Sequence, residues 1–587
     1  MAASPLEGVS GPVDVAIKAD GNAIDDVLEI LSVSVRAEVG RVPECVIVFA
    51  DGSPAEQEFP LTDAATFKPG ATVEVGAHFG ADASQTIFEG VAVAQRLRLT
   101  PRGSRLEVTC RGEAVKLMQV RRTAVFKDQK DSAVISSIAG DAGLSATVDT
   151  VTTAARDQVQ NDCTDWDFIR LLADRNGLML TTEGATLEAK AFDASAAPVL
   201  TLTFGTDIED FDAEVAAPPA LSAATGRAWD ASAQETVDAT GTAPPAGKWG
   251  DLARTALATP MGDHTFALAT PAPLADSDLA AHAGARLIRS EQAIITGRVR
   301  FCGSAKVRPG VTLELAGLGA RFGGTGLVTG VMHRIEAGAW TTQATLGLPP
   351  EWRSDGVALQ APAAAALATP LPGLHVGKVL KIHDDPDANA RIQVSLPALA
   401  ADGVELWARF AAPYAGAETG MMFLPEIDDE VVVGFLAEDP AYPVVLGALH
   451  SAANARPVDA DEGNTQKVIQ TASKLKMTFD DDKKILTLET PGGASVTLDD
   501  EGGTLALADQ NGNSIEMSSS GIKIDTPGDL ALSATGNVEV AATMDATITG
   551  MNVSAEADVG FTGKGNATAE VSASGTMTVK GAMVMIN

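Results

Sequence analysis

The sequence predicts a mainly β protein with a minor α/β part: two tandem β-barrels, a small five-stranded barrel, and a C-terminal rod formed by three intertwined chains. Three observations lead to this prediction. The 587 residues are too many for one hydrophobic core, so several domains are expected. Aromatic residues are scarce at 4% while glycine is common, which is typical of many short strands and turns. Near the C-terminus, apolar–polar–apolar triplets recur at short intervals, which indicates very short strands.

Residues 1–350 read as strands with helical insertions. The segments 71–79 (ATVEVGAHF) and 104–112 (SRLEVTCRG) alternate apolar and polar residues, as strands do. A Pro-Gly turn followed by a strand occurs twice, at 67–75 (FKPGATVEV) and 307–317 (VRPGVTLELAG), and therefore predicts two related barrels. Capping residues and periodic apolar positions predict helices over 131–143, 162–177 and 274–292.

The middle of the chain changes composition twice. Residues 351–372 are rich in Ala and Pro and are predicted to be a linker. Residues 373–450 carry five strand patterns, which fit a small Greek-key barrel of the OB kind. Residues 451–467 form a polar neck before the repeats.

Residues 468–587 are repeats. Asp529, Asn537 and Asp545 lie eight residues apart. The apolar pairs that follow them are the predicted core of the rod: Leu530, Leu532, Val538, Val540, Ala546 and Ile548. One such strand cannot bury itself, but stacked units can share a core. The period of eight and the small side chains favour three chains wrapped around one axis. A single-chain solenoid and a disordered polar tail are the alternatives.

Charge and cysteine content limit the partners. The chain has 43 Lys and Arg against 77 Asp and Glu, a net charge of −34, so nucleic acid is not expected as a partner. Four widely spaced cysteines indicate free thiols rather than zinc ligands or disulfides. The N-terminus lacks the pattern of a signal peptide, and no stretch of 18 apolar residues occurs. Synthesis in the cytoplasm without a signal peptide is therefore expected.

In the order of its motifs, the chain resembles the central spike of contractile injection machines, the VgrG-like proteins with a fused hub, OB domain and needle. The matching segments follow one another along the chain: 67–94, 160–180, 307–338, 421–457, 475–500 and 579–587. The resemblance implies a hub over 1–350, an OB domain over 373–450 and a triple-stranded β-helix needle over 468–587. It also implies a homotrimer that caps an inner tube of the Hcp-like kind, binds baseplate proteins, carries effectors and crosses the target membrane transiently.

The resemblance also implies a tip. A small PAAR-repeat protein is expected to dock on the blunt end of the needle, formed by Met583, Val584, Met585, Ile586 and Asn587. The OB segment 393–410 (QVSLPALAADGVELWARF) lacks the His-Trp-Asp-Arg stretch of type VI members. This departure favours an extracellular or phage-tail-like particle over a type VI machine.

The sequence predicts no catalytic, cofactor or metal site. All seven histidines lie at or before His450, so the needle has no histidine-based metal site. The acidic run 480–482 and the DQNGN segment 509–513 are interpreted as strand-connecting turns rather than cation sites. Two other functions remain as alternatives: a peptidoglycan hydrolase that punctures cells, and a trimeric tail fibre or adhesin. The 17-residue neck is too short for a hydrolase domain, and no receptor-binding knob is expected after the needle.

Overall fold

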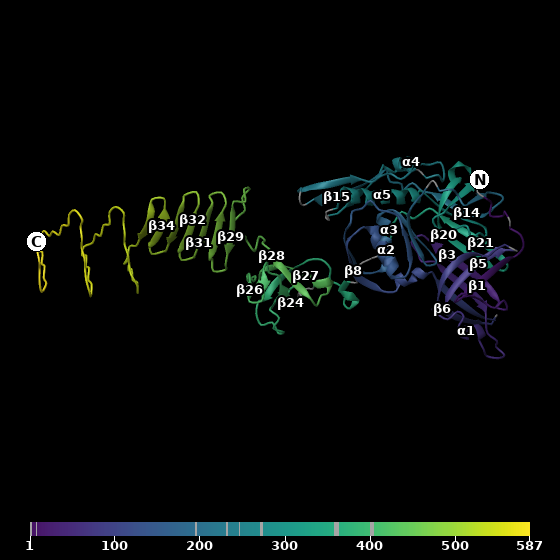
Figure 1. Ribbon diagram of the computed structural model, residues 1–587, viewed down its shortest axis with the longest axis horizontal. Coiled ribbons are helices and arrows are strands. Elements are labelled where there is room, and N and C mark those ends of the chain that lie inside the picture. The colour runs from purple at the N-terminus through teal and green to yellow at the C-terminus, as the bar shows by residue number, and fades with distance from the viewer. Residues whose placement is uncertain are drawn as a thin grey trace. The chain divides into compact units, whose positions relative to one another are not determined.

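The computed structural model describes residues 3–7, 9–80, 82–101, 103–193, 196–230, 233–245, 247–270, 274–356, 363–399 and 404–586. The chain forms two compact units. One comprises Met1–Pro372 with Phe435–Ala441, and the other comprises Gly373–Gly434 with Tyr442–Asn587. Figure 1 traces both units from the N-terminus in purple to the C-terminus in yellow. Strands predominate in both, which confirms the predicted mainly β class.

The N-terminal unit is built around one sheet of 13 strands, whose main path runs β14-β18-β21-β20-β3-β4-β7-β6-β5-β1-β2, with β13 and β19 paired to its side. Its strands are β1 (Val13–Ala19), β2 (Asn22–Ala23), β3 (Ile30–Glu38), β4 (Glu44–Ala50), β5 (Thr72–Phe79), β6 (Gln85–Thr100), β7 (Gly103–Arg111), β13 (Leu200–Thr203), β14 (Ile208–Val215), β18 (Ile295–Cys302), β19 (Thr312–Ala316), β20 (Gly324–Glu336) and β21 (Ala339–Leu346).

The two predicted Pro-Gly units adopt the same backbone arrangement. Gly70 and Gly310 have φ values of +103° and +95°, a region that suits glycine. Each glycine N–H donates to the carbonyl of a facing strand, at Ala92 and at Val328, over 2.8 Å. The amides of Ala92 and Val328 in turn donate to the residue after each glycine, again over 2.8 Å. A register shift follows directly in both strands, before Ala94 in β6 and before Gly330 in β20. The two units are therefore structural repeats.

The strands of the two predicted barrels are joined rather than separate. β3 pairs antiparallel with β20 from Glu38↔Gly330 to Ser32↔Glu336, so one sheet runs through both halves. Two buried clusters remain distinct. The first includes Phe49, Phe67 and Leu106, and the second includes Phe301, Leu313 and Val328. Pairing the two edges satisfies backbone groups that separate barrels would leave exposed.

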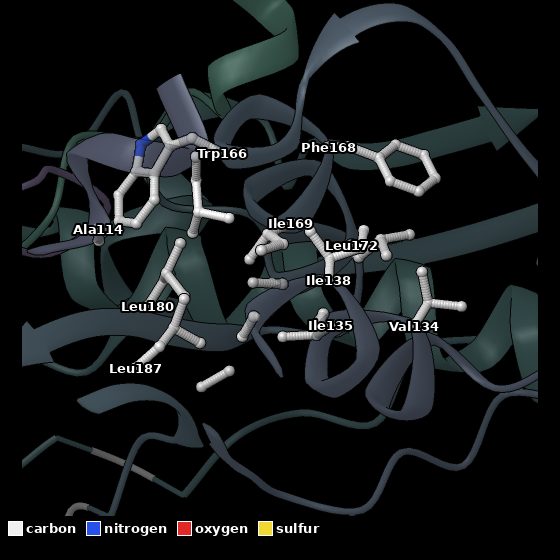
Figure 2. Packing of buried hydrophobic residues seen from close by; sticks show 14 of the residues in the cluster. Ala114, Val134, Ile135, Ile138, Trp166, Phe168, Ile169, Leu172, Leu180 and Leu187 are labelled. Atoms are coloured by element: carbon white, nitrogen blue, oxygen red, sulfur yellow. The ribbon is translucent and has the colours of Figure 1, made fainter. Parts of the chain in front are cut away.

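An α/β layer with its own core lies between these halves in the sequence. Its helices are α2 (Asp131–Asp141) and α3 (Asp165–Arg175), with η1 (Glu113–Met118) beside them. Its strands are β8 (Arg121–Gln129), β9 (Ser145–Val148), β10 (Arg156–Thr164), β11 (Leu178–Glu183) and β12 (Thr186–Ala191). Thr164 caps α3 by accepting the Asp167 N–H at 3.1 Å. Figure 2 shows Trp166, Ile169 and Leu172 gathered with Ile135 and Ile138 in this core.

The predicted third helix is α5 (Asp276–Ala293). It packs on a three-stranded sheet of β16 (Glu235–Thr240), β15 (Ala223–Asp230) and β17 (Thr265–Ala269). The remaining short helices of this unit are α1 (Pro60–Asp63), α4 (Arg254–Ala258), η2 (Thr259–Met261), α6 (Gly319–Phe322), α7 (Arg353–Gly356), η3 (Ala363–Ala366) and η4 (Leu436–Glu438). Part of the predicted linker, 357–362, lies outside the described residues.

The C-terminal unit begins with a closed barrel of five strands, as the sequence predicts for an OB-fold. The strands are β22 (His375–Lys381), β23 (Arg391–Ser395), β24 (Glu405–Phe410), β27 (Glu430–Phe435) and β28 (Pro443–Ala448). A small hairpin of β25 (Ala415–Gly416) and β26 (Thr419–Gly420) projects between β24 and β27. Val379, Val394 and Val433 are fully buried in the barrel.

After the barrel, seven strands form one antiparallel sheet, here called the C-terminal sheet. They are β29 (Gln466–Gln470), β30 (Lys476–Asp480), β31 (Ile485–Glu489), β32 (Ser495–Asp499), β33 (Thr504–Ala508), β34 (Ser514–Ser518) and β35 (Gly521–Asp525). Every strand pairs with the next one in sequence. Residues 526–586, here called the terminal segment, contain no strand or helix and are drawn in Figure 1 as successive turns of coil.

Candidate functional site

One face of the C-terminal sheet carries two parallel rows of apolar side chains. The antiparallel register places Leu488 opposite both Met477 and Val496, and Leu486 opposite both Phe479 and Leu498. The same register continues through the later strands, where Leu507 faces Ile515 and Leu505 faces Met517. The apolar pairs predicted from the sequence are therefore aligned across strands, which is the unit of sheet stabilisation.

The opposite face of the same strands is polar at its centre. Thr487 lies between Thr478 and Thr497, and Glu516 lies between Ala506 and Lys523. Successive side chains of a strand point to opposite faces, so the apolar rows and the Thr, Glu and Lys row cannot share a side. The sheet is thus amphipathic, with one face suited to burial.

That apolar face is only partly covered within one chain. Leu488 is 39% exposed, Leu498 is 45% exposed, and Ile522 near the end of the sheet is 68% exposed. A sheet normally covers its apolar face with a second layer. Large contiguous apolar patches of this kind mark interaction surfaces in soluble proteins.

A cavity of about 460 Å³ lies at the first strands of this face. Ile469, Met477 and Leu488 line it from the sheet, and Phe423 lines it from the loop after β26. Met422 and Phe423 are 83% and 56% exposed. The loop therefore adds apolar surface next to the sheet.

The predicted core residues of the terminal segment are all exposed in the single chain. Five of them have exposed fractions between 58% and 83%: Leu530, Leu532, Val538, Val540 and Ile548. Ala546 is also exposed. A single chain does not bring them together, so their role as a core stays a prediction.

The predicted tip residues lie at the end of the same segment. Met583, Met585 and Ile586 are at least 79% exposed and Val584 is 49% exposed. Asn587 lies outside the described residues. Their part in docking a tip protein stays a prediction as well.

The two acidic stretches that could suggest cation sites are turns. Asp509 accepts the N–H groups of Asn511 and Asn513, at 2.8 and 3.0 Å, between β33 and β34. These hydrogen bonds lower the pKa of Asp509, with the Asn513 side chain contributing most. Asp480 accepts the Lys483 N–H at 3.0 Å in the turn after β30. Across the described ranges, no group of three or more His, Cys, Asp or Glu is placed to hold a metal ion.

All four cysteines are free thiols, as the spacing predicts. Cys45 and Cys110 face each other across β4 and β7, and both are fully buried. Burial raises the pKa of Cys110 to about 12 and raises that of Cys45 as well. These thiols are therefore core residues with little thiolate character.

In the part of the chain that the structure describes, no helix has the length and apolar character needed to cross a bilayer.

Two family models match the chain. The model for the Alg8 N-terminal domain covers residues 10–337, which is more than half of the chain. The model for the type VI secretion system/phage-baseplate injector OB domain covers residues 375–450, the closed barrel described above.

Relatives with spike names match shorter segments. The Pseudomonas aeruginosa type VI secretion system spike protein VgrG5 is 33% identical over 94 residues, which are 16% of this chain and 12% of the relative. The Vibrio cholerae type VI secretion system spike protein VgrG3 is 35% identical over 65 residues, or 11% of this chain and 6% of the relative. The chain thus spans only about a tenth of the curated relatives that it matches.

Among solved structures, the Escherichia coli type VI secretion component c3393 aligns with a TM-score of 0.37 and 14% identity, over 74% of this chain and 99% of that chain. The spike resemblance is confirmed by the OB-domain and VgrG sequence matches. The chain belongs to the family of the Alg8 N-terminal domain, and it is a VgrG-like protein with the injector OB domain of type VI secretion systems and phage baseplates.

Proposed function

We propose that this protein is the structural spike of a contractile injection machine. Three copies form a hub that caps the inner tube at the centre of the baseplate, and their C-terminal parts wind into one rigid needle. The needle carries a PAAR-type tip protein on Met583–Ile586 and punctures the target envelope when the sheath contracts. The spike has a mechanical role and no catalytic role.

The observation that carries the proposal is the uncovered apolar face of the C-terminal sheet. Leu498 lies in the middle of this face and is 45% exposed, although Leu486 and Leu505 flank it on both sides. Three such faces around one axis would bury each other and form a closed prism. The terminal segment beyond β35 also has exposed apolar side chains, which two partner chains would bury in the same way.

The repeat in the hub supports the tube-capping part of the proposal. The Gly70 and Gly310 units share backbone conformation, hydrogen bonds and a following register shift. Two equivalent units in each of three chains give six similar positions around a ring. A hexameric inner tube would meet a matching pseudo-sixfold surface on such a hub.

A rigid needle needs its backbone groups paired and its core free of polar side chains. In the C-terminal sheet, each strand is already bonded to the next, so the partner chains need to supply only the apolar contacts. In the terminal segment, the partners would also supply the missing strand pairs. Such a column resists local opening, which is the property that force transmission requires.

The test is the mass of the full-length protein in solution, measured by sedimentation velocity. We expect three times the chain mass of 60.2 kDa. Leu498→Asp should raise the trimer dissociation constant at least tenfold, because three carboxylates would meet at the axis. Thr497→Asp adds the same charge on the other face of the same strand and should leave the trimer intact.

A monomeric wild-type chain at micromolar concentration would overturn the proposal, and so would equal effects of the two substitutions. Peptidoglycan cleavage by the purified protein would overturn the mechanical role and favour a hydrolase.

A further inference from the structure

A second cavity, of about 370 Å³, lies in the N-terminal unit where the β3–β4 turn, the end of β7, α3 and α7 meet. Its lining includes five arginines: Arg36, Arg41, Arg111, Arg170 and Arg353. Among the described residues, the acidic ones in the lining are Glu38 and Glu44, so this lining carries a net charge of +3. This excess of positive charge stands out in a chain whose net charge is −34.

Three of these arginines have carboxylate partners within the cavity wall. Arg36 and Arg41 share Glu38, with N–O distances of 2.5 and 3.0 Å. Arg111 pairs with Glu44 at 2.5 Å. Both glutamates are therefore already paired with Arg36, Arg41 or Arg111.

Arg170 has no ion pair within 4 Å among the residues that the structure describes. The carboxylate whose charge acts on Arg170 is that of Asp174, which already binds Arg289 at 2.6 Å and the Arg353 N–H at 3.1 Å. Burial lowers the pKa of Arg170, Asp174 opposes this effect, and the positive charges of Arg353 and Arg289 lower the pKa further. Arg170 is half-buried. A partly desolvated cation without a close counter-ion is unfavourable unless an anion joins it.

Arg353 is also incompletely satisfied. Its Nε is buried and has no hydrogen-bond partner, although the Asp167 carboxylate lies 3.4 Å away. Asp167 is also engaged by the Thr164 hydroxyl at 3.0 Å. Two guanidinium groups at one cavity thus retain capacity for a further acceptor.

The backbone is shaped to admit the Arg170 side chain. Gly40 has a φ of +69°, and a Cβ at this position would lie 2.9 Å from the Arg170 Nε. The Gly40 N–H donates to the Leu180 carbonyl at 2.7 Å, which holds the turn in place. Glycine meets both conditions without strain.

The rest of the lining is apolar. Trp166 and Val42 are buried, with exposed fractions of 4% and 6%, while Met118 is 45% exposed at the cavity. Trp166 lies one turn before Arg170 on α3, so ring and guanidinium share one helix face. The cavity therefore offers an apolar wall next to the two arginines.

We propose that this cavity binds a carboxylate carried on an apolar stem, namely the acidic side chain or the C-terminus of a partner chain. The carboxylate accepts from Arg170 and Arg353, and the stem packs on Trp166 and Met118. A compact anion such as phosphate fits less well, because it has no apolar stem to pack against Trp166 and Met118. The proposal does not depend on trimer formation.

The experiment is isothermal titration calorimetry of the full chain with the peptide acetyl-Leu-Glu-Leu-amide. Its isosteric Gln peptide and inorganic phosphate at equal ionic strength are the comparison probes. We expect the Glu peptide to bind at least tenfold more tightly than either one. Absent binding of the Glu peptide, or equal binding of the Gln peptide or of phosphate, overturns the proposal.

Variants locate the binding. Arg170→Gln should raise the dissociation constant of the Glu peptide at least tenfold. Arg300→Gln removes an exposed arginine on β18, which pairs with Glu209 at 3.4 Å, and should have no effect. Because Arg170→Gln could disturb folding, Met118→Glu provides a second test at a half-exposed position. Its new carboxylate should occupy the site and block the peptide, whereas Met118→Gln should not. Unchanged binding in Met118→Glu, or in a folded Arg170→Gln protein, overturns the site.

The trimer dissociation constant of the Arg170→Gln variant then shows which chain supplies the natural carboxylate. If a second copy supplies it, Arg170→Gln raises the trimer dissociation constant at least tenfold. If another protein supplies it, the trimer of Arg170→Gln forms normally. Both results support the site and assign its ligand. The failure of wild-type trimerisation would affect only the proposed function, because the peptide titration stands by itself.

Discussion

Individual buried polar residues in the N-terminal unit have specific partners. Asp131 is fully buried, receives Arg175 through two hydrogen bonds of 2.5 and 2.6 Å, and also accepts from Asn176. His333 is 3% exposed, and its Nδ1 lies 2.9 Å from the Thr342 Oγ1. Removing one partner of such a pair leaves an unsatisfied group in the core.

His333 gives the N-terminal unit a specific pH dependence. Burial lowers the pKa of His333 from 6.5 to about 4. The unfolded chain therefore binds the proton first as the pH falls. The contribution of neutral His333 to the free energy of unfolding is complete above pH 6.5 and is lost as the pH approaches 4. We expect the free energy of unfolding to fall by about 2 kcal/mol from this residue between pH 7 and pH 5.

The measurement is urea unfolding of the wild type and of His333→Gln at several pH values. The variant should lose this part of the pH dependence, and His264→Gln, at an exposed position, should keep it. Parallel pH profiles for the wild type and His333→Gln would contradict the assignment.

At the scale of elements, short local patterns decide the turns. The Pro-Gly units before β5 and β19 need a positive φ at their glycines. An added Cβ at Gly70 or Gly310 would meet nothing within 4 Å, so only the backbone conformation opposes a side chain. The two units should therefore respond alike to the same substitution.

We expect Gly70→Ala and Gly310→Ala each to lower the free energy of unfolding by about 1–3 kcal/mol, because alanine is strained at this φ. Gly140→Ala is the matched control. Gly140 lies in α2 and a Cβ there also meets nothing, so alanine should stabilise the helix by about 0.5–1 kcal/mol. Denaturant unfolding of the three variants is the measurement. A neutral result at only one of the two turns would argue against their equivalence.

For the whole molecule, charge would oppose the proposed trimer while apolar burial would favour it. Each chain carries −34, so a trimer would carry three times this charge. The segment from residue 467 onward contains 8 Lys and Arg and 16 Asp and Glu, a difference of −8 per chain and −24 for three chains. In the proposed needle, this negative charge is expected to reduce adhesion to anionic lipid.

This balance predicts the effect of salt on assembly. Raising the ionic strength from about 0.01 M to 0.15 M shortens the Debye length from about 30 to 8 Å and screens the repulsion. The trimer dissociation constant should therefore fall, as measured by sedimentation equilibrium. A neutral osmolyte is the control, because it does not screen charges. Weaker association in salt would mean that ion pairs between chains hold the assembly together.

The sequence by itself determined the mainly β class, the five strands of the barrel, three helices and the repeated Pro-Gly units. These features depend on neighbouring residues, through alternation, capping and positive φ, so they can be predicted from the sequence. It also predicted the apolar pairs of the C-terminal sheet, since their alternation is local. For the terminal segment it predicted a core that one chain does not form.

Only the tertiary structure decided which distant segments meet. The pairing of Glu38 with Gly330 joins strands almost 300 residues apart, and no local pattern specifies that edge. The cavity of about 370 Å³ likewise combines Arg41, Arg170 and Arg353 from separate elements. No sequence pattern around any of these arginines distinguishes it from a surface residue. Long-range contacts of this kind follow from the packing of whole layers, because many registers satisfy the local pattern and few bury the cores.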